Sequence, residues 1–235
     1  MQRPGADVSD PRMSAPTIVF DLDGTLIDTA PDLIDTLNVV FAREGLPALP
    51  YQTARNLIGG GAKAMIARGL ALNRAAVIPA KLESMFADFL AHYAEHIADR
   101  SRPFPGLTDA LDALAADGRR LAVCTNKLER LSRQLLGELK LLGRFAAVCG
   151  QDTFGVQKPD PEMLRRTIAA AGGDPRRAIM VGDSATDIRT ARAAGVPVIA
   201  VDFGYSEVPV SEFAPDRVIG HFKQLPAAIA AFSPE

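Results

Sequence analysis

Several features that mark membrane, secreted or nucleic-acid-binding proteins are missing from the sequence. None of its apolar runs approaches the roughly 20 residues that span a bilayer. The first fifteen residues are mostly polar or small, without the apolar stretch of a secretion signal. The net charge is −2 at pH 7, so nothing in the charge balance favours binding to nucleic acid or to an anionic membrane. We therefore expect no nucleic-acid partner and no membrane partner.

Cysteine is scarce, and tryptophan is absent. The two cysteines, Cys124 and Cys149, each end an apolar run that is typical of a buried strand. Two such thiols provide no disulfide framework and indicate a reducing compartment, so the sequence predicts a cytoplasmic protein. Hydrophobic residues make up 48% of the chain, and charges of both signs are interspersed, which favours a globular enzyme over a disordered or fibrous chain.

Apolar runs alternate with helical patterns over most of the chain. The runs predict five buried strands, at residues 17–20, 121–124, 145–149, 178–181 and 196–200. Pro197 in the last run suggests an edge strand or a strand start. Helices are expected between the strands, two of them over residues 161–171 and 186–194. This alternation predicts an α/β core with a doubly wound, Rossmann-like parallel sheet, in which ligands bind beyond the carboxyl ends of the strands.

Residues 31–102 interrupt this alternation because they show only helical periodicity. One apolar stripe contains Leu33, Leu37, Val40 and Phe41, and a second runs from Leu82 to Tyr93. The sequence therefore predicts an all-helical cap at residues 30–102, inserted into a core formed by residues 16–29 and 103–235. The joints are expected near residues 29–30 and 102–103, and residues 1–15 are expected to form a flexible extension.

Two acidic residues follow the first predicted strand, in the motif Asp21-Leu22-Asp23-Gly24-Thr25. In an extended chain, alternation would point Asp21 and Asp23 the same way, and Gly24 would permit a tight turn. Two converging carboxyl groups repel each other unless a cation or a proton offsets the charge. Oxygen ligands of this kind favour a hard divalent cation, with Mg²⁺ as the first choice.

Further polar residues follow the other predicted strands. Thr125 and Asn126 could hold phosphate oxygens without adding charge; they could instead cap the next helix, a role that does not exclude phosphate binding. Lys158 precedes a predicted helix, where an ammonium group and the helix N-terminus both favour an anion. Asp183 and Asp187 supply two more carboxylates after the fourth strand.

In this order, the four motifs resemble those of the haloacid-dehalogenase-like hydrolases, and the resemblance covers nearly the whole chain beyond Ala15. It implies that Asp21 is a nucleophile that becomes phosphorylated, and that Asp23 protonates the leaving oxygen and later activates water. It also implies that Thr125 and Lys158 bind the phosphoryl group. Mg²⁺ would be held by a set of acidic residues: the Asp21 side chain, the Asp23 backbone carbonyl and Asp183, with Asp187 as a supporting partner.

Within that superfamily, the chain looks most like phosphoglycolate phosphatases with a helical cap. The similarity rests on Asp28-Thr29, on Ile58-Gly59-Gly60-Gly61-Ala62 and on Pro103-Phe104-Pro105-Gly106. Thr125-Asn126-Lys127 and Gly182-Asp183-Ser184 also match the pattern. It implies hydrolysis of a small phosphomonoester, with 2-phosphoglycolate as the first choice and a monomer or homodimer as the assembly. Asn126, Gly60 and Gly61 are the candidate substrate-binding residues, although the glycines could merely join two cap helices.

Alternative functions stay open at this point. A phosphosugar mutase is one, although residues 31–46 lack the histidine and tryptophan that such mutases carry early in the cap. Others are a phosphatase of another sugar phosphate or of pyrophosphate, and a non-catalytic protein that keeps the pocket. Dehalogenases of the superfamily lack the second aspartate, so Asp23 argues against them. A phosphonate-cleaving relative would need a cap lysine, and the candidates Lys63 and Lys81 sit in no motif of that kind.

Overall fold

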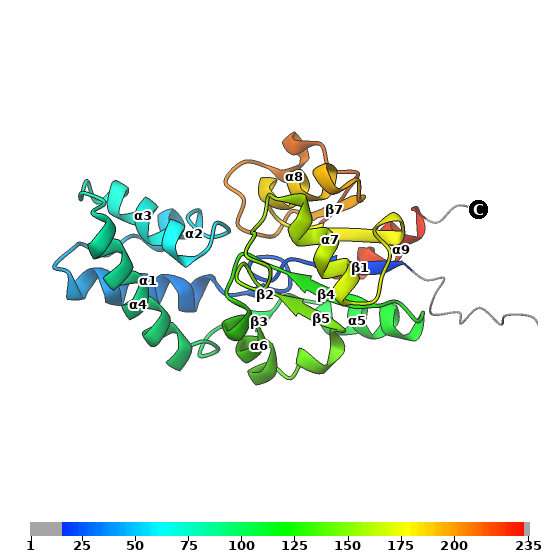
Figure 1. Cartoon of the computed structure of the whole chain (residues 1–235), viewed down its shortest axis with the longest axis horizontal. Helices are drawn as coiled ribbons and strands as arrows, with labels where there is room; N and C mark the ends of the chain where they lie inside the picture. Colours follow the sequence, from blue (N-terminus) through cyan, green and yellow to red (C-terminus); the bar gives the residue numbers. More distant parts are fainter. Residues whose placement is uncertain (1–15, 233–235) are drawn as a thin grey trace, which may run out of the picture.

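The computed structural model describes residues 16–232, so the predicted extension at residues 1–15 lies outside the described residues. A sheet of six parallel strands lies at its centre, in the order β5-β4-β1-β6-β7-β8, as Figure 1 shows in part. The strands are β1 (Thr17–Phe20), β4 (Leu121–Cys124), β5 (Ala147–Cys149), β6 (Ala178–Gly182), β7 (Val198–Val201) and β8 (Arg217–Ile219). The doubly wound α/β core predicted from the sequence is confirmed.

The structure refines the strand predictions in detail. The third predicted strand is shorter than expected, because β5 begins only at Ala147. Pro197 lies just before β7, so it marks the start of a strand; it is not in an edge strand, because β7 pairs with both β6 and β8. The edge strands are β5 and β8, and the sequence analysis missed β8: Arg217 and Val218 are exposed, so β8 has no apolar run.

Both faces of the sheet are buried over most of its strands, which explains why the strands other than β8 are almost entirely apolar. Ile18 and Phe20 of β1 pack on one side with residues of α5 (Leu107–Ala116), α6 (Glu129–Glu138) and α9 (Leu225–Ala230). Val19, between them, packs on the other side with α7 (Pro161–Ala170) and α8 (Ala185–Ala194). Short 3-10 helices lie at Leu142–Arg144, Pro175–Arg177, Val210–Phe213 and Phe222–Gln224.

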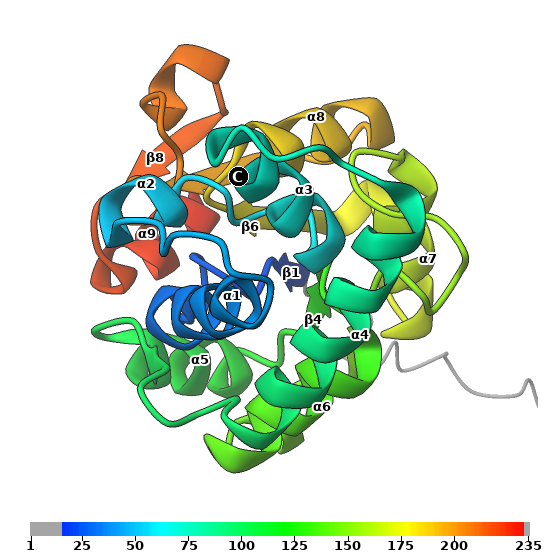
Figure 2. The ribbon, with the colours of Figure 1, turned by 90° about the vertical axis from the view of Figure 1, so that its left-hand side faces the viewer.

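Four helices form a lobe beside the sheet, and we call this lobe the cap (Figure 1). They are α1 (Ala30–Arg43), α2 (Tyr51–Arg55), α3 (Ala62–Leu72) and α4 (Pro79–Glu95). Seen from the side of the cap, these helices lie in front of β1 and β4 (Figure 2). The predicted stripe on α1 is buried, and Met85, Phe89 and Tyr93 of the second stripe are buried as well.

The chain enters and leaves the cap through two short strands that lie side by side. β2 (Ile27–Asp28) pairs with β3 (Arg102–Pro103) in an antiparallel manner, with Ile27 opposite Pro103. The two crossings therefore form one narrow ribbon next to the predicted joints.

Two further expectations concern location. Cys124 and Cys149 are register partners on β4 and β5, and both are buried and free of disulfides. Among residues 16–232, no helix combines the length and apolarity needed to cross a bilayer. The cytoplasmic location stays a prediction.

Candidate active site

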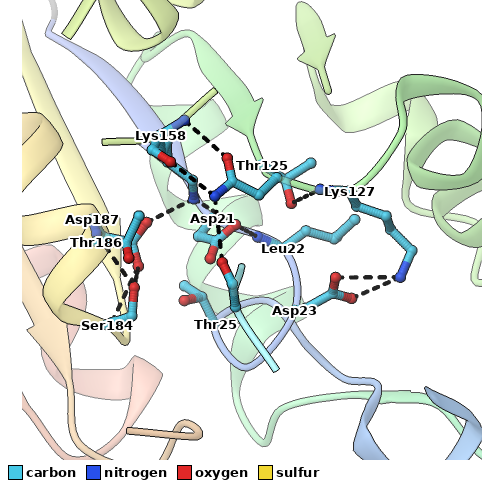
Figure 3. Close-up of polar contacts among 12 residues, drawn as sticks. Asp21, Leu22, Asp23, Thr25, Thr125, Lys127, Lys158, Ser184, Thr186 and Asp187 are labelled. Carbon is cyan, nitrogen blue, oxygen red and sulfur yellow. Dashed lines mark hydrogen bonds and ion pairs between the residues drawn. The ribbon is translucent and has the colours of Figure 1, made fainter. Parts of the chain in front are cut away.

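Lys158 joins two aspartates that lie far apart in the sequence. Its Nζ lies 2.8 Å from Oδ1 of Asp21 and 2.7 Å from Oδ1 of Asp187 (Figure 3). Asp21 directly follows β1, and Asp187 lies in the first turn of α8. All three side chains are buried, so each charge is offset mainly by its partners rather than by water.

A third aspartate completes a buried acidic cluster. Asp21, Asp183 and Asp187 each offer a carboxylate oxygen, and these three atoms lie within 4.8 Å of one another. Hard divalent cations prefer such oxygen ligands, and a cation would offset the repulsion among the three carboxylates. The residues present therefore fit a divalent metal ion at the carboxyl ends of β1 and β6.

The pKa values of these groups reflect burial and their mutual repulsion. Burial raises the pKa of Asp21 to about 8; Lys158 opposes this shift, and the carboxylates of Asp187 and Asp183 reinforce it. The pKa of Asp183 is raised to about 6, first by burial and then by Asp187. Burial alone would lower the pKa of Lys158, but Asp187 and Asp21 outweigh it and keep this pKa above its ordinary value. Lys158 thus remains an ammonium at the centre of the cluster.

Asp183 is held through both of its carboxylate oxygens. The hydroxyl of Thr25 donates to Oδ1 at 2.8 Å, and the backbone N–H of Tyr205 donates to Oδ2 at 2.8 Å. Gly24 presses against the same group: a Cβ there would lie 2.5 Å from Asp183 Oδ2, and its φ of +85° is also unfavourable for other residues. Gly24 and Thr25 of the first motif therefore help to fix the Asp183 carboxylate of the fourth motif.

Asp187 has a structural contact in addition to its ion pair. It forms a capping box at the start of α8, in which its Oδ2 accepts from the backbone N–H and the hydroxyl of Ser184. Its Oδ1 is the atom that faces Lys158. One carboxylate thus begins the helix and orients the lysine.

Asp23 lines the same cavity as Asp21, as expected of two side chains that point the same way, but it is not part of the acidic cluster. Its carboxylate pairs with Lys127 Nζ at 3.0 Å (Figure 3). It also accepts from the Thr29 hydroxyl at 2.8 Å. The chain does not stay extended after Asp21. It turns, and the N–H of Gly24 donates to the carbonyl of Ile27.

Asn126 and Thr125 contact neighbouring motifs. The amide of Asn126 brackets the backbone of Lys158: its Oδ1 accepts from the Lys158 N–H at 2.9 Å, and its Nδ2 donates to the Lys158 carbonyl at 3.1 Å. The hydroxyl of Thr125 accepts from the backbone N–H of Lys127 at 3.2 Å. Asn126 therefore fixes the loop that carries Lys158, and its contact with a substrate stays a prediction.

A cavity of about 40 Å³ lies between the cap and the carboxyl ends of β1 and β4. Asp21, Asp23 and Thr125 form part of its wall on the core side. On the cap side the wall is mainly apolar, with Met65, Phe86, Phe89, Leu90 and Tyr93. Of the two candidate glycines, Gly61 lies in this wall, whereas Gly60 lines a separate hollow beside Lys63. The cavity has room for a small group beside the carboxylates.

A family model for haloacid dehalogenase-like hydrolases matches residues 18–201, which contain Asp21, Asp23, Thr125, Lys158, Asp183 and Asp187. The chain belongs to the haloacid dehalogenase-like hydrolase family. The resemblance seen in the four motifs is thereby confirmed.

Curated relatives in this family include phosphatases that align over nearly their whole length. The chain is 50% identical over 218 residues to a phosphoglycolate phosphatase of Mesorhizobium japonicum, covering 93% of this chain and 96% of that protein. It is 36% identical to an N-acetylmuramic acid 6-phosphate phosphatase of Pseudomonas aeruginosa, covering 91% of this chain and 94% of the other. Membership of the family and these relatives identify the protein as a phosphoric monoester hydrolase.

The fold also matches a solved structure of the haloacid dehalogenase-like type. The crystal structure of a predicted phosphoglycolate phosphatase from Haemophilus somnus superimposes with a TM-score of 0.84 at 26% identity. The match covers 91% of this chain and 97% of that one, so it includes both the sheet and the helical cap.

Three residues of this hydrolase site were not among the candidates from the sequence. Lys127 follows Thr125-Asn126 directly, and Tyr205 lies just beyond the apolar run of β7. The position of both residues shortly after a predicted strand could have marked them as site residues. Arg55 of α2 had none. Its guanidinium donates to the carbonyls of Phe203 and Gly204 and lies 4.9 Å from the centre of the Tyr205 ring.

Proposed function

We propose that the protein hydrolyses 2-phosphoglycolate through a phosphorylated Asp21. The observation that carries the proposal is the gathering of Asp21, Lys158 and Asp183 at one end of the sheet, beside a small cavity that also contains Asp23. The relative at 50% identity is named a phosphoglycolate phosphatase, which supports the choice of substrate.

In the first step, a carboxylate oxygen of Asp21 attacks phosphorus, and the bond from phosphorus to the glycolate oxygen breaks. Asp23 donates a proton to that leaving oxygen, so glycolate departs as an alcohol. Lys158 faces the attacking carboxylate and would offset charge on the phosphoryl oxygens. Splitting one displacement into two in this way lowers the barrier of each.

In the second step, water attacks phosphorus of the acyl phosphate and Asp23 accepts a proton from it. The bond between phosphorus and Asp21 breaks, which releases inorganic phosphate and restores the carboxylate. The apolar cap side chains Phe86, Phe89 and Leu90 would keep other water out of the cavity during both steps.

We further propose that Mg²⁺ binds at Asp21 and Asp183, with the backbone carbonyl of Asp23 as another ligand and Asp187 in support. When bound, the ion would neutralise charge on the phosphoryl oxygens. Thr125 would hold one of these oxygens with its hydroxyl, and Gly61, at the cavity wall, would allow close approach of the substrate.

Phosphate release from a panel of esters with Mg²⁺ tests this function. The panel contains 2-phosphoglycolate, N-acetylmuramic acid 6-phosphate, glucose 6-phosphate and pyrophosphate. We expect the highest kcat/KM for 2-phosphoglycolate, and roughly a 10⁴-fold loss or more for Asp21→Asn. Asp109→Asn, at an exposed position on α5, is the matched control and should keep full activity.

Other outcomes assign another function. A higher kcat/KM for a sugar phosphate or pyrophosphate would replace the substrate but keep the chemistry. Isomerisation of a sugar phosphate with little phosphate released would indicate a mutase. Full activity of Asp21→Asn, or after chelation of divalent cations, would refute the mechanism.

A further inference from the structure

Lys127 connects Asp23 to the cap. Its Nζ lies 3.0 Å and 3.3 Å from the two carboxylate oxygens of Asp23, and it donates to the hydroxyl of Tyr93 at 2.8 Å. The ammonium also lies 4.4 Å from the centre of the Tyr93 ring. These contacts occupy the donors of Lys127 in a site where the side chain is only 6% exposed.

The three residues come from three separate parts of the fold. Asp23 follows β1, Lys127 follows β4, and Tyr93 lies in the last turns of α4 in the cap. Figure 3 shows Lys127 extending toward the Asp23 carboxylate, on the side of Asp23 away from Lys158. One ammonium group therefore bridges the core, the candidate proton donor and the cap.

Thr29, at the joint between core and cap, makes a second contact with the Asp23 carboxylate. The hydroxyl of Thr29, the residue just before α1, donates to Asp23 Oδ1 at 2.8 Å. Asp23 is thus held by Lys127 on the core side and by Thr29 at the entry to the cap. A carboxylate with two fixed donors keeps one orientation, which is what proton transfer to a leaving oxygen requires.

Packing holds the Tyr93 side chain in place beside Lys127. It is fully buried, and its ring stacks on Phe89 of the same helix with ring centres 5.8 Å apart. Both rings line the cavity between cap and core. The position of α4 therefore sets where the hydroxyl of Tyr93 meets Lys127.

We propose that Lys127 is a positioning residue for Asp23, and that Tyr93 makes this positioning depend on the placement of the cap. The inference rests on the proposed function, in which Asp23 donates the proton to the leaving group. Lys127 itself touches neither the phosphoryl group nor the reacting oxygen in this scheme. Its effect reaches the reaction only through the orientation of Asp23.

The proposal predicts a dependence on the leaving group. An alkoxide such as that of glycolate needs a proton as it departs, whereas p-nitrophenolate is stable enough to leave without one. Misplacing Asp23 should therefore slow the hydrolysis of alkyl phosphates much more than that of p-nitrophenyl phosphate. A general loss of folding or of phosphate binding would lower both rates together.

The experiment compares Lys127→Met, Tyr93→Phe and the control Lys81→Met on three esters with Mg²⁺. The esters are 2-phosphoglycolate, 2-hydroxyethyl phosphate and p-nitrophenyl phosphate. For Lys127→Met we expect roughly a 100-fold loss of kcat on both alkyl esters and less than about a fivefold loss on p-nitrophenyl phosphate. Tyr93→Phe keeps the stacked ring and should show the same pattern at roughly tenfold. Lys81 pairs with Glu44 at the cap surface, so its substitution should change none of the three rates.

A double substitution isolates the interaction between Asp23 and Lys127. In an Asp23→Asn background there is no carboxylate to orient, so adding Lys127→Met should cost less than about threefold on the alkyl esters. Full additivity of the two losses would overturn the proposal. An equal loss on all three esters in Lys127→Met would overturn it as well.

The remaining outcomes separate this inference from the proposed function. A loss confined to 2-phosphoglycolate would mean that Lys127 binds the substrate carboxylate, which contradicts a positioning role and leaves the phosphatase intact. Absence of turnover of every ester by the wild-type protein would refute the proposed function itself. If Lys127→Met does not fold, as judged by circular dichroism, Tyr93→Phe decides alone: a loss on the alkyl esters supports the proposal, and unchanged rates overturn it.

Discussion

The backbone N–H of Tyr205 donates a hydrogen bond of 2.8 Å to Oδ2 of Asp183. The hydroxyl of the same tyrosine donates to Asp28 at 2.7 Å and accepts from the backbone N–H of Ala30 at 2.9 Å. The loop after β7 therefore connects a candidate metal ligand with the entry to the cap. Partners of this kind orient a ligand before the metal ion binds, so their loss weakens metal affinity.

The substitution Gly204→Ala should weaken the response to Mg²⁺. A Cβ on Gly204 would lie 2.2 Å from the Cβ of Asp183 and 2.4 Å from its Oδ2, so the carboxylate or the loop has to move. We expect the Mg²⁺ concentration for half-maximal phosphate release to rise by roughly 10- to 100-fold. A titration of phosphate release with Mg²⁺ measures this half-maximal concentration.

Gly137→Ala is the matched control for that substitution. Gly137 lies inside α6, and nothing lies within 4 Å of the position that its Cβ would take. Alanine there should leave Mg²⁺ activation unchanged and raise the free energy of unfolding by up to about 1 kcal/mol. An unchanged Mg²⁺ response in Gly204→Ala would show that Asp183 does not bind the ion in the way proposed.

The stability of the metal-free protein should fall as the pH rises through the titration of Asp21. Burial raises the pKa of this carboxyl from an ordinary 3.8 to about 8 in the folded protein. The folded state thus binds the proton more tightly than the unfolded state. This contribution is fully present below about pH 4 and is lost as the pH approaches 8, with Asp183, whose pKa is about 6, acting in the same direction.

Thermal unfolding in the presence of a chelator checks this dependence. Between pH 6 and pH 8.5 the wild-type protein should lose more stability than Asp21→Asn, whose side chain is neutral throughout, by on the order of 1 kcal/mol. Asp109→Asn should follow the wild type. Added Mg²⁺ should stabilise the wild type more at pH 8 than at pH 6, since the ion competes with protons for the same oxygens. Parallel pH profiles of the wild type and Asp21→Asn would contradict the assignment.

Much of the fold was accessible from local sequence because the sheet is covered on both faces. The runs at residues 17–20, 121–124 and 178–181 are apolar without interruption, and each is a strand whose carboxyl end carries a candidate site residue. The edge strand β8 was missed for the opposite reason, since two of its three residues are exposed. Local pattern thus predicts buried strands, the edge strand β5 included, better than exposed strands such as β8.

The contacts of individual side chains were harder to predict from the sequence than the strands. The placement of Asp23 depends on a turn after Asp21 and on Lys127, a residue about a hundred positions away, so alternation along the strand could not predict the pairing of its carboxylate with Lys127. The amide of Asn126 likewise faces the backbone of Lys158, which no local motif indicates. Such contacts form only when strands distant in sequence become neighbours.

Arg55 offers a test of whether contact between cap and core matters for substrate binding. It lies in α2 of the cap, yet it donates to the Phe203 and Gly204 carbonyls in the loop that also supports Asp183. Substitution Arg55→Ala removes a charged donor from two carbonyls and the contact with the Tyr205 ring. We expect KM for 2-phosphoglycolate to rise roughly tenfold, the equivalent of losing one charged hydrogen bond.

The matched control is Arg100→Ala, which removes an exposed ion pair with Asp35 and should leave KM within about twofold. Steady-state kinetics of both variants measure the difference, and their Mg²⁺ titrations show where it arises. If Arg55 acts through the cap, KM rises while the Mg²⁺ response stays close to that of the wild type. If KM is unchanged and only the Mg²⁺ response weakens, Arg55 acts through the loop that holds Asp183, and the cap contact has no part in substrate binding.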